Sequence, residues 1–406
     1  MSFFSGIPKI RVFLGCRQDA SLPYNLGGRI GSASTHGNIN VQQGDNVERR
    51  KFLQGTGIAG ILAAGAAPAI VHAQEQIRWR LASSFPKSLD TVFGASEVFA
   101  KNVADATGGK FNITVHPAGE LVPAFGVVDA VQGGTVECAH TAPYYFFGKD
   151  ETFALDCAVP FGMSSRAMTA WMYEGNGLKL FREFYAQFNI VNIPCGNTGA
   201  QMGGWYRKEI KSVADLEGLK FRVGGFGGRV LGKLGVVSQN IPAGEIYQAL
   251  EKGTIDAAEW IGPYDDLKLG LHKVASNYYF PAWWEGSTQF SLYINDKQWN
   301  SLSKEYQAIV TQAASDAHVG CQARYDARNP NALKQLVAEG AKLSRFPRDV
   351  MDAAFKASRE VYAELNDKNP NWKKIFPDYS RFLADQVQWE SVAEGNYAQY
   401  MAAQKL

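Results

Sequence analysis

The sequence predicts an α/β protein of two lobes, with a cleft between the lobes and long helices at the C-terminus. Three observations support this fold class. Segments that alternate like strands are interleaved with segments of helical spacing from residue 77 to residue 261, as in open α/β sheets. The strand segments become shorter after residue 190, which indicates a second lobe. After Ser303 almost all of the chain has helical spacing.

The first lobe follows a regular order of strand and helix. Its expected elements are a strand over 77–85, a helix over 88–107, a strand over 111–115, a short helix over 125–131 and a strand over 136–145. Paired glycines at 108–109 and 133–134 mark the ends of the two helices. This alternation favours parallel neighbours within one sheet.

A helix rich in aromatic residues is expected over 165–188, and the second lobe follows it. The short strands expected in the second lobe are 190–193, 203–207, 219–223, 236–241 and 256–261. The segments 278–284 and 290–294 are expected to form a strand that crosses back to the first lobe. Two α/β lobes joined by crossing strands leave a cleft, which is a preferred place for a ligand. The predicted bounds are 74–199 with 288–327 for lobe I, 200–287 with 328–365 for lobe II, and 366–406 for a C-terminal helical extension.

The C-terminal third is helical in pattern. Ser303 is a plausible N-cap. A narrow apolar seam repeats at alternating spacings of four and three residues and suits packing against another helix; it consists of Met351, Phe355, Ser358, Tyr362 and Leu365. The tail from residue 379 to residue 406 adds an amphipathic helix, which either covers the two lobes or reaches a second subunit.

The N-terminus carries an export pattern. Residues 48–54 contain Arg49-Arg50, a weakly apolar run extends over 56–71, and Ala73 ends a site suited to a signal peptidase. We interpret this as a twin-arginine signal that delivers the protein to the periplasm; the alternative is a short core helix. The run is too short for a comfortable membrane span. Residues 1–46 do not fit a signal, and we expect translation to start at Val47.

Composition excludes several classes of function. A net charge of +2 gives no indication of nucleic-acid binding. Cysteines and histidines of the exported part have no metal-type spacing, and we expect free, buried thiols; they are Cys138, Cys157, Cys195, Cys321, His116, His140, His272 and His318. No phosphate-binding loop or nucleophile elbow is present. The sequence therefore offers few candidates for catalytic residues.

A glycine-rich turn at 218–228 contains one arginine, Arg222, at the end of a short strand. A guanidinium among apolar residues pairs with an anion, which is a ligand carboxylate or an acid of the chain itself. Val230 occupies the place of the third glycine of a dinucleotide fingerprint, so that reading is disfavoured. We expect the glycines to leave room for a ligand and for lobe closure.

Two carboxylates end neighbouring strands of the predicted cleft. Glu259 precedes Trp260, and Glu285 follows a tryptophan pair. Two acids beside Arg222 would repel a carboxylate ligand unless a cation offsets them. Carboxylate and amide oxygens suit Na⁺ or Ca²⁺, and Gln201 is placed to join them. The alternative is that the two glutamates only pair with Arg222 or with lysines.

Several motifs in one order resemble a known family. They are Arg80-Leu-Ala-Ser-Ser-Phe-Pro, Ala118-Gly-Glu-Leu-Val-Pro123, Tyr144-Tyr145, Gln201-Met-Gly-Gly-Trp205, Gly218-Leu-Lys-Phe-Arg222-Val-Gly-Gly, Ala249-Leu-Glu-Lys-Gly-Thr-Ile-Asp256 with Glu259-Trp260, and Trp283-Trp-Glu-Gly286. Together they resemble the periplasmic solute-binding subunit of tripartite ATP-independent periplasmic (TRAP) transporters, and most closely its 2-oxo-monocarboxylate binders. The resemblance covers nearly all of residues 77–400.

The resemblance implies a two-lobed periplasmic solute-binding fold without enzymatic activity. It implies that Arg222 clamps a ligand carboxylate and that Tyr144 or Tyr145 with Asn197 forms hydrogen bonds to the ligand. Gln201, Glu259, Glu285 and the main-chain carbonyl of Trp260 would surround a cation, with Na⁺ favoured over Ca²⁺. It further implies the small and large TRAP membrane subunits as partners and a homodimer formed through the C-terminal helix.

Departures from the family pattern leave the solute open. Pro143 precedes the tyrosine pair and Phe146-Phe147 follow it, so the size of the pocket is not settled by the resemblance. Pyruvate, a longer 2-oxo acid, and lactate or another 2-hydroxy acid with Ca²⁺ all remain candidates. The alternatives of a different class are a periplasmic enzyme acting on 2-oxo acids and a binding module that serves a chemoreceptor or sensor kinase.

Overall fold

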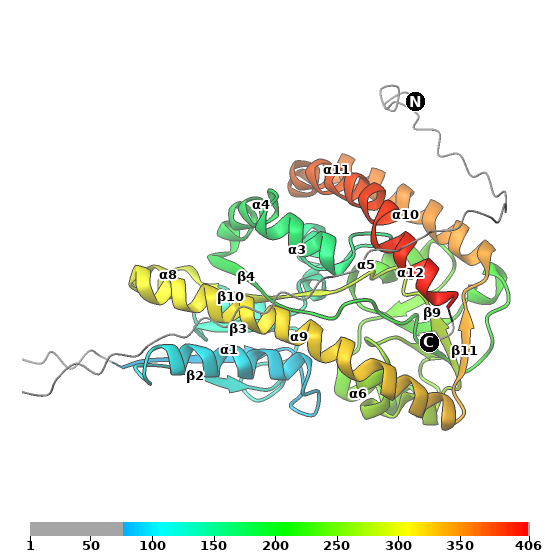
Figure 1. Ribbon diagram of the computed structural model, residues 1–406, viewed down its shortest axis with the longest axis horizontal. Coiled ribbons are helices and arrows are strands. Elements are labelled where there is room, and N and C mark those ends of the chain that lie inside the picture. Colours follow the sequence, from blue (N-terminus) through cyan, green and yellow to red (C-terminus); the bar gives the residue numbers. More distant parts are fainter. Residues whose placement is uncertain (1–75, 405–406) are drawn as a thin grey trace, which may run out of the picture. The chain divides into compact units, whose positions relative to one another are not determined.

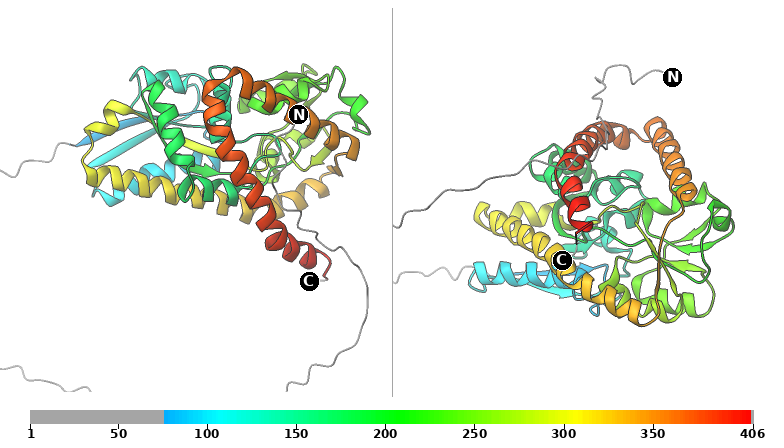
Figure 2. Two further views of the ribbon diagram at one scale, coloured as in Figure 1. Left: turned by 90° about the horizontal axis from the view of Figure 1, so that it is seen from above. Right: turned by 45° about the vertical axis from the view of Figure 1, so that its right-hand side comes forward.

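The computed structural model describes residues 76–404, so the predicted export signal and the segment before it lie outside the described residues. Two β-sheets divide this part of the chain, and long helices connect and cover them (Figure 1, Figure 2). No helix among residues 76–404 is long and apolar enough to cross a membrane. The α/β fold class predicted from the sequence is confirmed.

The first sheet has the strand order β2-β1-β3-β10-β4. Its strands are β1 (Ile77–Ser83), β2 (Phe111–His116), β3 (Cys138–Thr141), β4 (Ile190–Asn197) and β10 (Gln289–Asn295). β1 is parallel to β2 and β3, as the alternation of strand and helix predicts. β10 is antiparallel to β3 and β4 and is buried along its whole length. It follows strands of the second sheet in the chain but pairs within the first sheet, so it is the crossing strand that returns.

Helices and short 3₁₀ turns cover the first sheet. They are α1 (Val92–Ala106), α2 (Val127–Gln132), η1 (Pro143–Phe146), η2 (Glu151–Asp156), α3 (Ser165–Tyr173), α4 (Gly177–Tyr185) and η3 (Ala186–Phe188). The single helix expected over 165–188 is wrong, because it breaks between α3 and α4. A Cβ at Gly175 would lie 2.7 Å from the carbonyl oxygen of Trp171, and glycine also weakens a helix.

The strand expected over 136–145 is also too long. β3 ends at Thr141, and Pro143 then begins η1. Proline cannot donate to a strand ladder, which explains the end of the strand. This difference matters for function, because η1 presents Tyr144 and Tyr145 at the end of β3.

The second sheet has the order β11-β9-β5-β8-β6-β7. Its strands are β5 (Trp205–Tyr206), β6 (Lys220–Arg222), β7 (Val237–Gln239), β8 (Ala257–Ala258), β9 (Asn277–Phe280) and β11 (Lys342–Arg345). The segment 278–284 does not return to the first lobe as expected. β9 ends before Pro281 and pairs with β5 and β11. The sequence pattern also missed β11, which interrupts the helical C-terminal third.

The remaining helices lie around the second sheet and at the C-terminus. They are η4 (Val213–Leu216), α5 (Gly225–Gly232), α6 (Ala243–Glu251), α7 (Pro263–Leu269), η5 (Leu271–Lys273), α8 (Asp296–Ser301), α9 (Lys304–Ala338), α10 (Arg348–Lys368), α11 (Pro370–Val392) and α12 (Glu394–Ala402). Ser303 caps α9 by accepting from the main-chain N–H of Tyr306 at 3.2 Å, which confirms the predicted N-cap.

Helix α9, drawn in yellow to orange in Figure 1, belongs to both halves of the described chain. It packs on α1 and β4 of the first sheet and on α7 beside the second. The strands of the first sheet come from residues 77–197 and 289–295, and those of the second from residues 205–280 and 342–345. The predicted lobe bounds remain a prediction, and we use lobe I and lobe II below for the parts that carry the first and the second sheet.

The predicted seam of α10 is only partly buried. Ser358 and Leu365 are buried, whereas Phe355 is 51% exposed. Tyr362 stacks on Phe226 of α5 and on Trp372 of α11, so the seam holds α10 between those two helices. Four cysteines of the described chain are free and buried, as expected from the sequence.

Candidate functional site

Arg222 ends β6 and lies beside Ala258, the last residue of β8. Glu259, which follows β8, therefore meets its guanidinium. Nη1 of Arg222 donates to Oε1 and to the main-chain carbonyl of Glu259, both at 2.5 Å, and Nε donates to the carbonyl of Ile241 at 3.0 Å. The ring of Trp260 lies 5.0 Å from the guanidinium carbon. The acid of the chain that the sequence left as an alternative partner is therefore present.

The pairing of Arg222 with Glu259 uses only part of each group. Oε1 of Glu259 also accepts from the main-chain N–H of Gly224 at 3.0 Å. Nη2 of Arg222 and Oε2 of Glu259 have no hydrogen-bond partner in the described chain, although both residues are buried. Buried polar atoms of native proteins are normally paired, so each of these two atoms requires an explanation.

Gln201 and Glu285 lie on the two segments that join the sheets, and two threonines hold them. Nε2 of Gln201 donates to the hydroxyl of Thr288 at 2.7 Å and to that of Thr198 at 3.2 Å. The Thr288 hydroxyl donates to Oε2 of Glu285 at 2.7 Å. Within the described residues, Oε1 of Gln201 has no partner. The amide is thus oriented with its nitrogen engaged and its oxygen free to bind something else.

The electrostatics of this cluster are unbalanced. Burial, with the nearby Glu259 carboxylate, raises the pKa of Glu285 well above its ordinary value, and Arg222 lowers it only in part. Burial also raises the pKa of Glu259, which the charge of Arg222 opposes. One guanidinium therefore faces two buried carboxyl groups, and a bound cation would restore the balance.

Tyr144 brings lobe I into contact with the glycine-rich turn of lobe II. A Cβ at Gly224 or Gly225 would lie 2.7 or 2.6 Å from atoms of the Tyr144 side chain. Gly225 has a φ of 45°, which also disfavours other residues. At Gly224 and Gly225 the Tyr144 ring fills the adjacent space, so the expectation that the glycines of this turn leave room for a ligand stays a prediction.

Tyr145 faces an aromatic wall next to the same cluster. Its ring lies 5.1 Å from that of Tyr144, 4.9 Å from Phe125 and 6.3 Å from Phe85. Burial is the main cause of a raised pKa at Tyr145, with a smaller opposing effect from Arg222. The tyrosine is therefore a neutral hydrogen-bonding group near the guanidinium.

Asn197 is less directly connected to the cluster. Its Oδ1 accepts from the main-chain N–H of Gly199 at 2.9 Å at the end of β4, and its Nδ2 has no partner in the described chain. Thr198 beside it holds Gln201. Thr198 and Thr288 were not predicted as site residues, because threonines near a predicted site residue are too common in sequences to be informative without a structure.

The structure therefore brings Arg222, Gln201, Glu259, Trp260 and Glu285 into one buried cluster between the sheets, with Tyr144 and Tyr145 beside it. A cavity of about 370 Å³ adjoins this cluster and is lined by both tyrosines and by the turn at 223–228. We refer to these seven residues as the cleft cluster.

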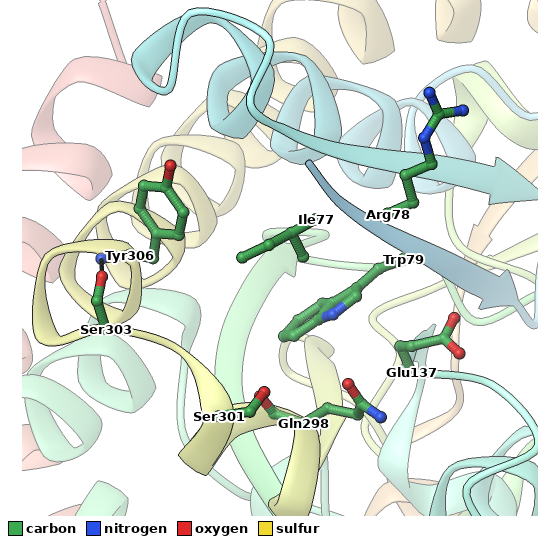
Figure 3. A pocket seen from close by; sticks show the side chains of 8 residues that line it. All are labelled: Ile77, Arg78, Trp79, Glu137, Gln298, Ser301, Ser303 and Tyr306. Atoms are coloured by element: carbon green, nitrogen blue, oxygen red, sulfur yellow. Dashed lines mark hydrogen bonds between the residues drawn. The ribbon is translucent and has the colours of Figure 1, made fainter. Parts of the chain in front are cut away.

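A larger cavity of about 570 Å³ lies beside the start of β1, an inner strand of the first sheet (Figure 3). Its lining comes from β1, α8 and the start of α9, and Figure 3 shows Arg78 pointing away from Trp79. None of its lining residues belongs to the set of buried unpaired atoms. Its acid, Glu137, is already paired with Arg80. The cleft cluster is thus the better candidate for a binding site.

No group of three or more histidine, cysteine, aspartate or glutamate side chains that could hold a metal occurs within residues 76–404. A cation in the cleft cluster would need the amide of Gln201 and a main-chain carbonyl besides the two carboxylates. Burial lowers the pKa of His140 and of His318 to about 4, so both are neutral core residues.

The sequence profile of the bacterial extracellular solute-binding proteins, family 7, matches residues 82–369. A monocarboxylate 2-oxoacid-binding periplasmic protein of Nostoc sp. is 47% identical over 327 residues, which are 80% of this chain and 90% of that protein.

Two solved structures extend the comparison. A TRAP transporter solute-binding protein from Bordetella bronchiseptica is 52% identical, with a TM-score of 0.80 over 81% of this chain and 98% of that chain; it is a mixed-occupancy dimer with copurified calcium and picolinate in one active site. A TRAP periplasmic solute-binding protein from Pseudoalteromonas atlantica, with bound sodium and pyruvate, is 38% identical, with a TM-score of 0.78 over 80% of this chain and 99% of that chain.

Proposed function

The chain belongs to family 7 of the bacterial extracellular solute-binding proteins, the solute receptors of TRAP transporters, and we propose that its solute is a small 2-oxo monocarboxylate such as pyruvate, bound with a cation. One observation carries this proposal. The unpaired buried atoms of the cleft cluster are a cationic donor, Nη2 of Arg222, and two acceptors, Oε2 of Glu259 and Oε1 of Gln201. A carboxylate needs the donor, and a hard cation needs the acceptors.

In the proposed complex the solute carboxylate pairs with Arg222. Gln201, Glu259, Glu285 and the main-chain carbonyl of Trp260 hold the cation, which supplies positive charge to the solute carboxylate and its 2-oxygen. Tyr144, Tyr145 and Asn197 contribute hydrogen bonds to the solute. Support for this assignment comes from the unpaired buried donor and acceptors of the cleft cluster and from the relatives crystallised with a cation and a small carboxylate.

Charge balance distinguishes the two candidate cations. With Arg222, two ionised glutamates and a monocarboxylate, a divalent cation gives a neutral site, whereas Na⁺ leaves one negative charge. Since burial raises the pKa of Glu285, Na⁺ could be accommodated with that carboxyl protonated. Ca²⁺ binding should therefore release about one proton, and Na⁺ binding should release fewer.

Solute capture would proceed by closure of the two lobes. The ring of Tyr144 from lobe I already lies on the glycine turn of lobe II, and Arg229 of α5 pairs with Glu151 of η2 at 3.2 Å. The closed receptor would then deliver its solute to the small and large membrane subunits in the periplasm. Export by the twin-arginine route is part of the proposal, and the residues that support it precede the described chain.

A homodimer through the C-terminal helices is also proposed. Large apolar side chains of α11 and α12 are 53% to 71% exposed; they are Val387, Trp389, Val392, Tyr397 and Tyr400. Large apolar side chains exposed on two consecutive helices point to an interaction surface, and the B. bronchiseptica relative is a dimer. Light scattering should give a dimer for the purified protein and a monomer for Trp389→Glu.

The experiment that tests the solute is a titration calorimetry series with pyruvate, lactate and longer 2-oxo acids. Each titration is run with Na⁺, with Ca²⁺ and after chelation, in two buffers of different ionisation enthalpy so that proton release is measured. The proposal predicts tightest binding of a 2-oxo monocarboxylate, and only with a cation. Tighter binding of lactate with Ca²⁺ would favour the 2-hydroxy acid alternative, and turnover of the solute would establish the enzyme alternative.

A further inference from the structure

Two consecutive aspartates lie in the first turn of α7, and both are buried: Asp265 is 0% and Asp266 1% exposed. Asp265 receives three hydrogen bonds. Its Oδ1 accepts from the hydroxyl of Thr91 at 2.6 Å, and its Oδ2 accepts from Tyr325 at 2.7 Å and from the indole N–H of Trp260 at 3.3 Å. These donors come from the start of α1, from α9 and from the cleft cluster, so one carboxylate connects lobe I, the shared helix and the solute site.

We propose that Asp265 is a positioning residue that couples the solute site to the contact between the lobes. The coupling has an inner part, from Asp265 to Trp260 and Arg222, and an outer part, from Asp265 to Thr91. The inference rests on the proposed function, because it concerns how tightly the bound solute is retained.

The inner part acts on the orientation of the Trp260 ring. The indole lies over the guanidinium of Arg222, with 5.0 Å between the ring centre and Cζ. Its N–H donates to Asp265, which fixes the rotation of the ring about its side-chain bonds. The guanidinium of Arg222 contacts Glu259, the carbonyl of Ile241 and the Trp260 ring. These three contacts fix its orientation, and with it the direction in which the unpaired Nη2 can donate a hydrogen bond. A fixed donor binds a carboxylate without first losing side-chain freedom.

The outer part acts on the closed arrangement of the lobes. Thr91 and Asp265 are both fully buried, so their hydrogen bond has no competing water, which makes it stronger than a surface contact. The neighbouring contacts of Asp90 with Lys268 and Arg328 also connect the lobes. Their side chains are 31% to 45% exposed, and ion pairs of that kind contribute little.

Asp266 offers a matched control in the same helical turn. Its Oδ2 accepts from the indole of Trp205 at 3.0 Å and from the hydroxyl of Tyr278 at 2.6 Å. Both donors belong to strands of the second sheet, and their rings stack at 3.9 Å. Asp266 is therefore as buried as Asp265, but its hydrogen bonds stay within lobe II.

The test compares Thr91→Val, which removes the hydroxyl at nearly constant volume, with Thr91→Ser, which keeps it. Stopped-flow dissociation of pyruvate in the presence of CaCl₂ should be about tenfold faster for Thr91→Val and within about twofold of the wild type for Thr91→Ser. Asp265→Asn should also accelerate dissociation. Asp266→Asn should lower the melting temperature and leave dissociation within about twofold of the wild type.

Two results would overturn the inference. One is a Thr91→Val protein that releases pyruvate at the wild-type rate. The other is an Asp266→Asn protein that releases it as fast as Asp265→Asn does, because the effect would then follow from general loss of stability. If Asp265→Asn does not fold, the Thr91 pair still decides between these outcomes.

A measurement without solute separates this inference from the proposed function. Amide hydrogen exchange over 88–94 and 262–269 reports how often the two segments part. Thr91→Val should raise exchange in both segments by about tenfold, and Thr91→Ser and Asp266→Asn should not. If the wild type bound neither pyruvate nor any related acid, the proposed function would fail, and unchanged exchange in Thr91→Val would independently exclude the coupling.

Discussion

Two buried carboxylates, Asp156 behind the first sheet and Glu259 at the end of β8, differ in how their oxygens are used. Asp156 has both oxygens paired: Oδ1 accepts from Gln289 at 3.0 Å, and Oδ2 accepts from Tyr185 at 2.8 Å and Ser291 at 2.9 Å. Glu259 has one oxygen paired and the other without a partner in the described chain.

The feature that distinguishes Glu259 is an unpaired oxygen beside an unpaired cationic donor; Asp266 also has an unpaired oxygen, Oδ1, but it is not in the cleft cluster. Asp156 and Glu259 are both 0% exposed, so burial alone does not distinguish them. A carboxylate with all its acceptors paired is part of the structure, whereas an unpaired oxygen beside an unpaired guanidinium nitrogen costs stability unless a ligand supplies the partner. We therefore assign Asp156 to the framework and Glu259 to the site.

The largest expected effect is that of Arg222→Ala on solute binding. Removal of the only cationic donor of the cleft cluster should weaken pyruvate binding by at least about a hundredfold, because the carboxylate and Glu259 would both lose their partner. Titration calorimetry measures this loss. Arg222→Lys keeps the charge but not the planar fork, and it should recover only part of the affinity.

Asp156→Asn is the control for that experiment, since it changes an equally buried acid outside the cleft cluster. Its affinity for pyruvate should equal that of the wild type. If Arg222→Ala binds pyruvate with wild-type affinity, the guanidinium is structural and the distinction between the two acids is wrong.

A smaller effect is expected for Glu285→Gln. The amide keeps the hydrogen bond with Thr288 but removes the negative charge, so Ca²⁺ should be bound about ten- to a hundredfold more weakly in the presence of pyruvate. Calcium titration by calorimetry gives the change. An unaltered calcium affinity would mean that Glu285 does not ligate the cation.

Asp156 should affect the free energy of unfolding and the dependence of that free energy on pH. Burial raises the pKa of Asp156 to about 7, despite its hydrogen bonds to Tyr185, Ser291 and Gln289. Between about pH 4 and pH 7 the folded state then holds a proton that the unfolded state has lost, so the free energy of unfolding falls as the pH rises. Asp156→Asn should flatten this slope by roughly 1 kcal/mol per pH unit.

Denaturant unfolding at several pH values between 4 and 7 tests this expectation. Asp266, whose pKa burial also raises to about 7, contributes a slope of the same sign in both proteins, so the difference between them isolates Asp156. Identical slopes for the wild type and Asp156→Asn would show that Asp156 keeps the same charge in the folded and unfolded states.

The smallest expected effect is that of Tyr144→Phe. The ring remains to fill the space beside Gly224 and Gly225, and only one hydroxyl is lost. Pyruvate affinity should fall by about three- to tenfold if that hydroxyl binds the solute. An unchanged affinity would restrict Tyr144 to the packing of the lobes, and Tyr145→Phe would then be the variant to test for a solute contact.

The sequence predicted the fold class because periodicity identifies long elements well. The strand at 77–83 and the cap at Ser303 follow directly from alternation and from capping chemistry. The short strand β11 was not predicted, because it is held by pairing with β9, which is distant in the sequence. The break between α3 and α4 falls at Gly175-Asn176-Gly177, a local breaker pattern that the prediction of a single helix passed over.

For the site, the sequence could identify residue types at strand ends but not which of their polar atoms are hydrogen-bonded within the chain. It placed Arg222 near Glu259 and left open whether the acid or a solute satisfies the guanidinium. In the structure, Nη1 of Arg222 donates a hydrogen bond to Glu259, and Nη2 has no partner in the described chain. Which of the two nitrogens is paired depends on the orientation of the guanidinium, and that orientation is set by the pairing of β6 with β8 and by the ring of Trp260.

A crystal structure of the protein with pyruvate and calcium would locate both ligands at once. We expect the pyruvate carboxylate on Nη2 of Arg222 and the cation on Oε2 of Glu259 and Oε1 of Gln201, the atoms without partners in the described chain. Pyruvate or calcium bound elsewhere, with these atoms paired to each other or to water alone, would contradict this expectation.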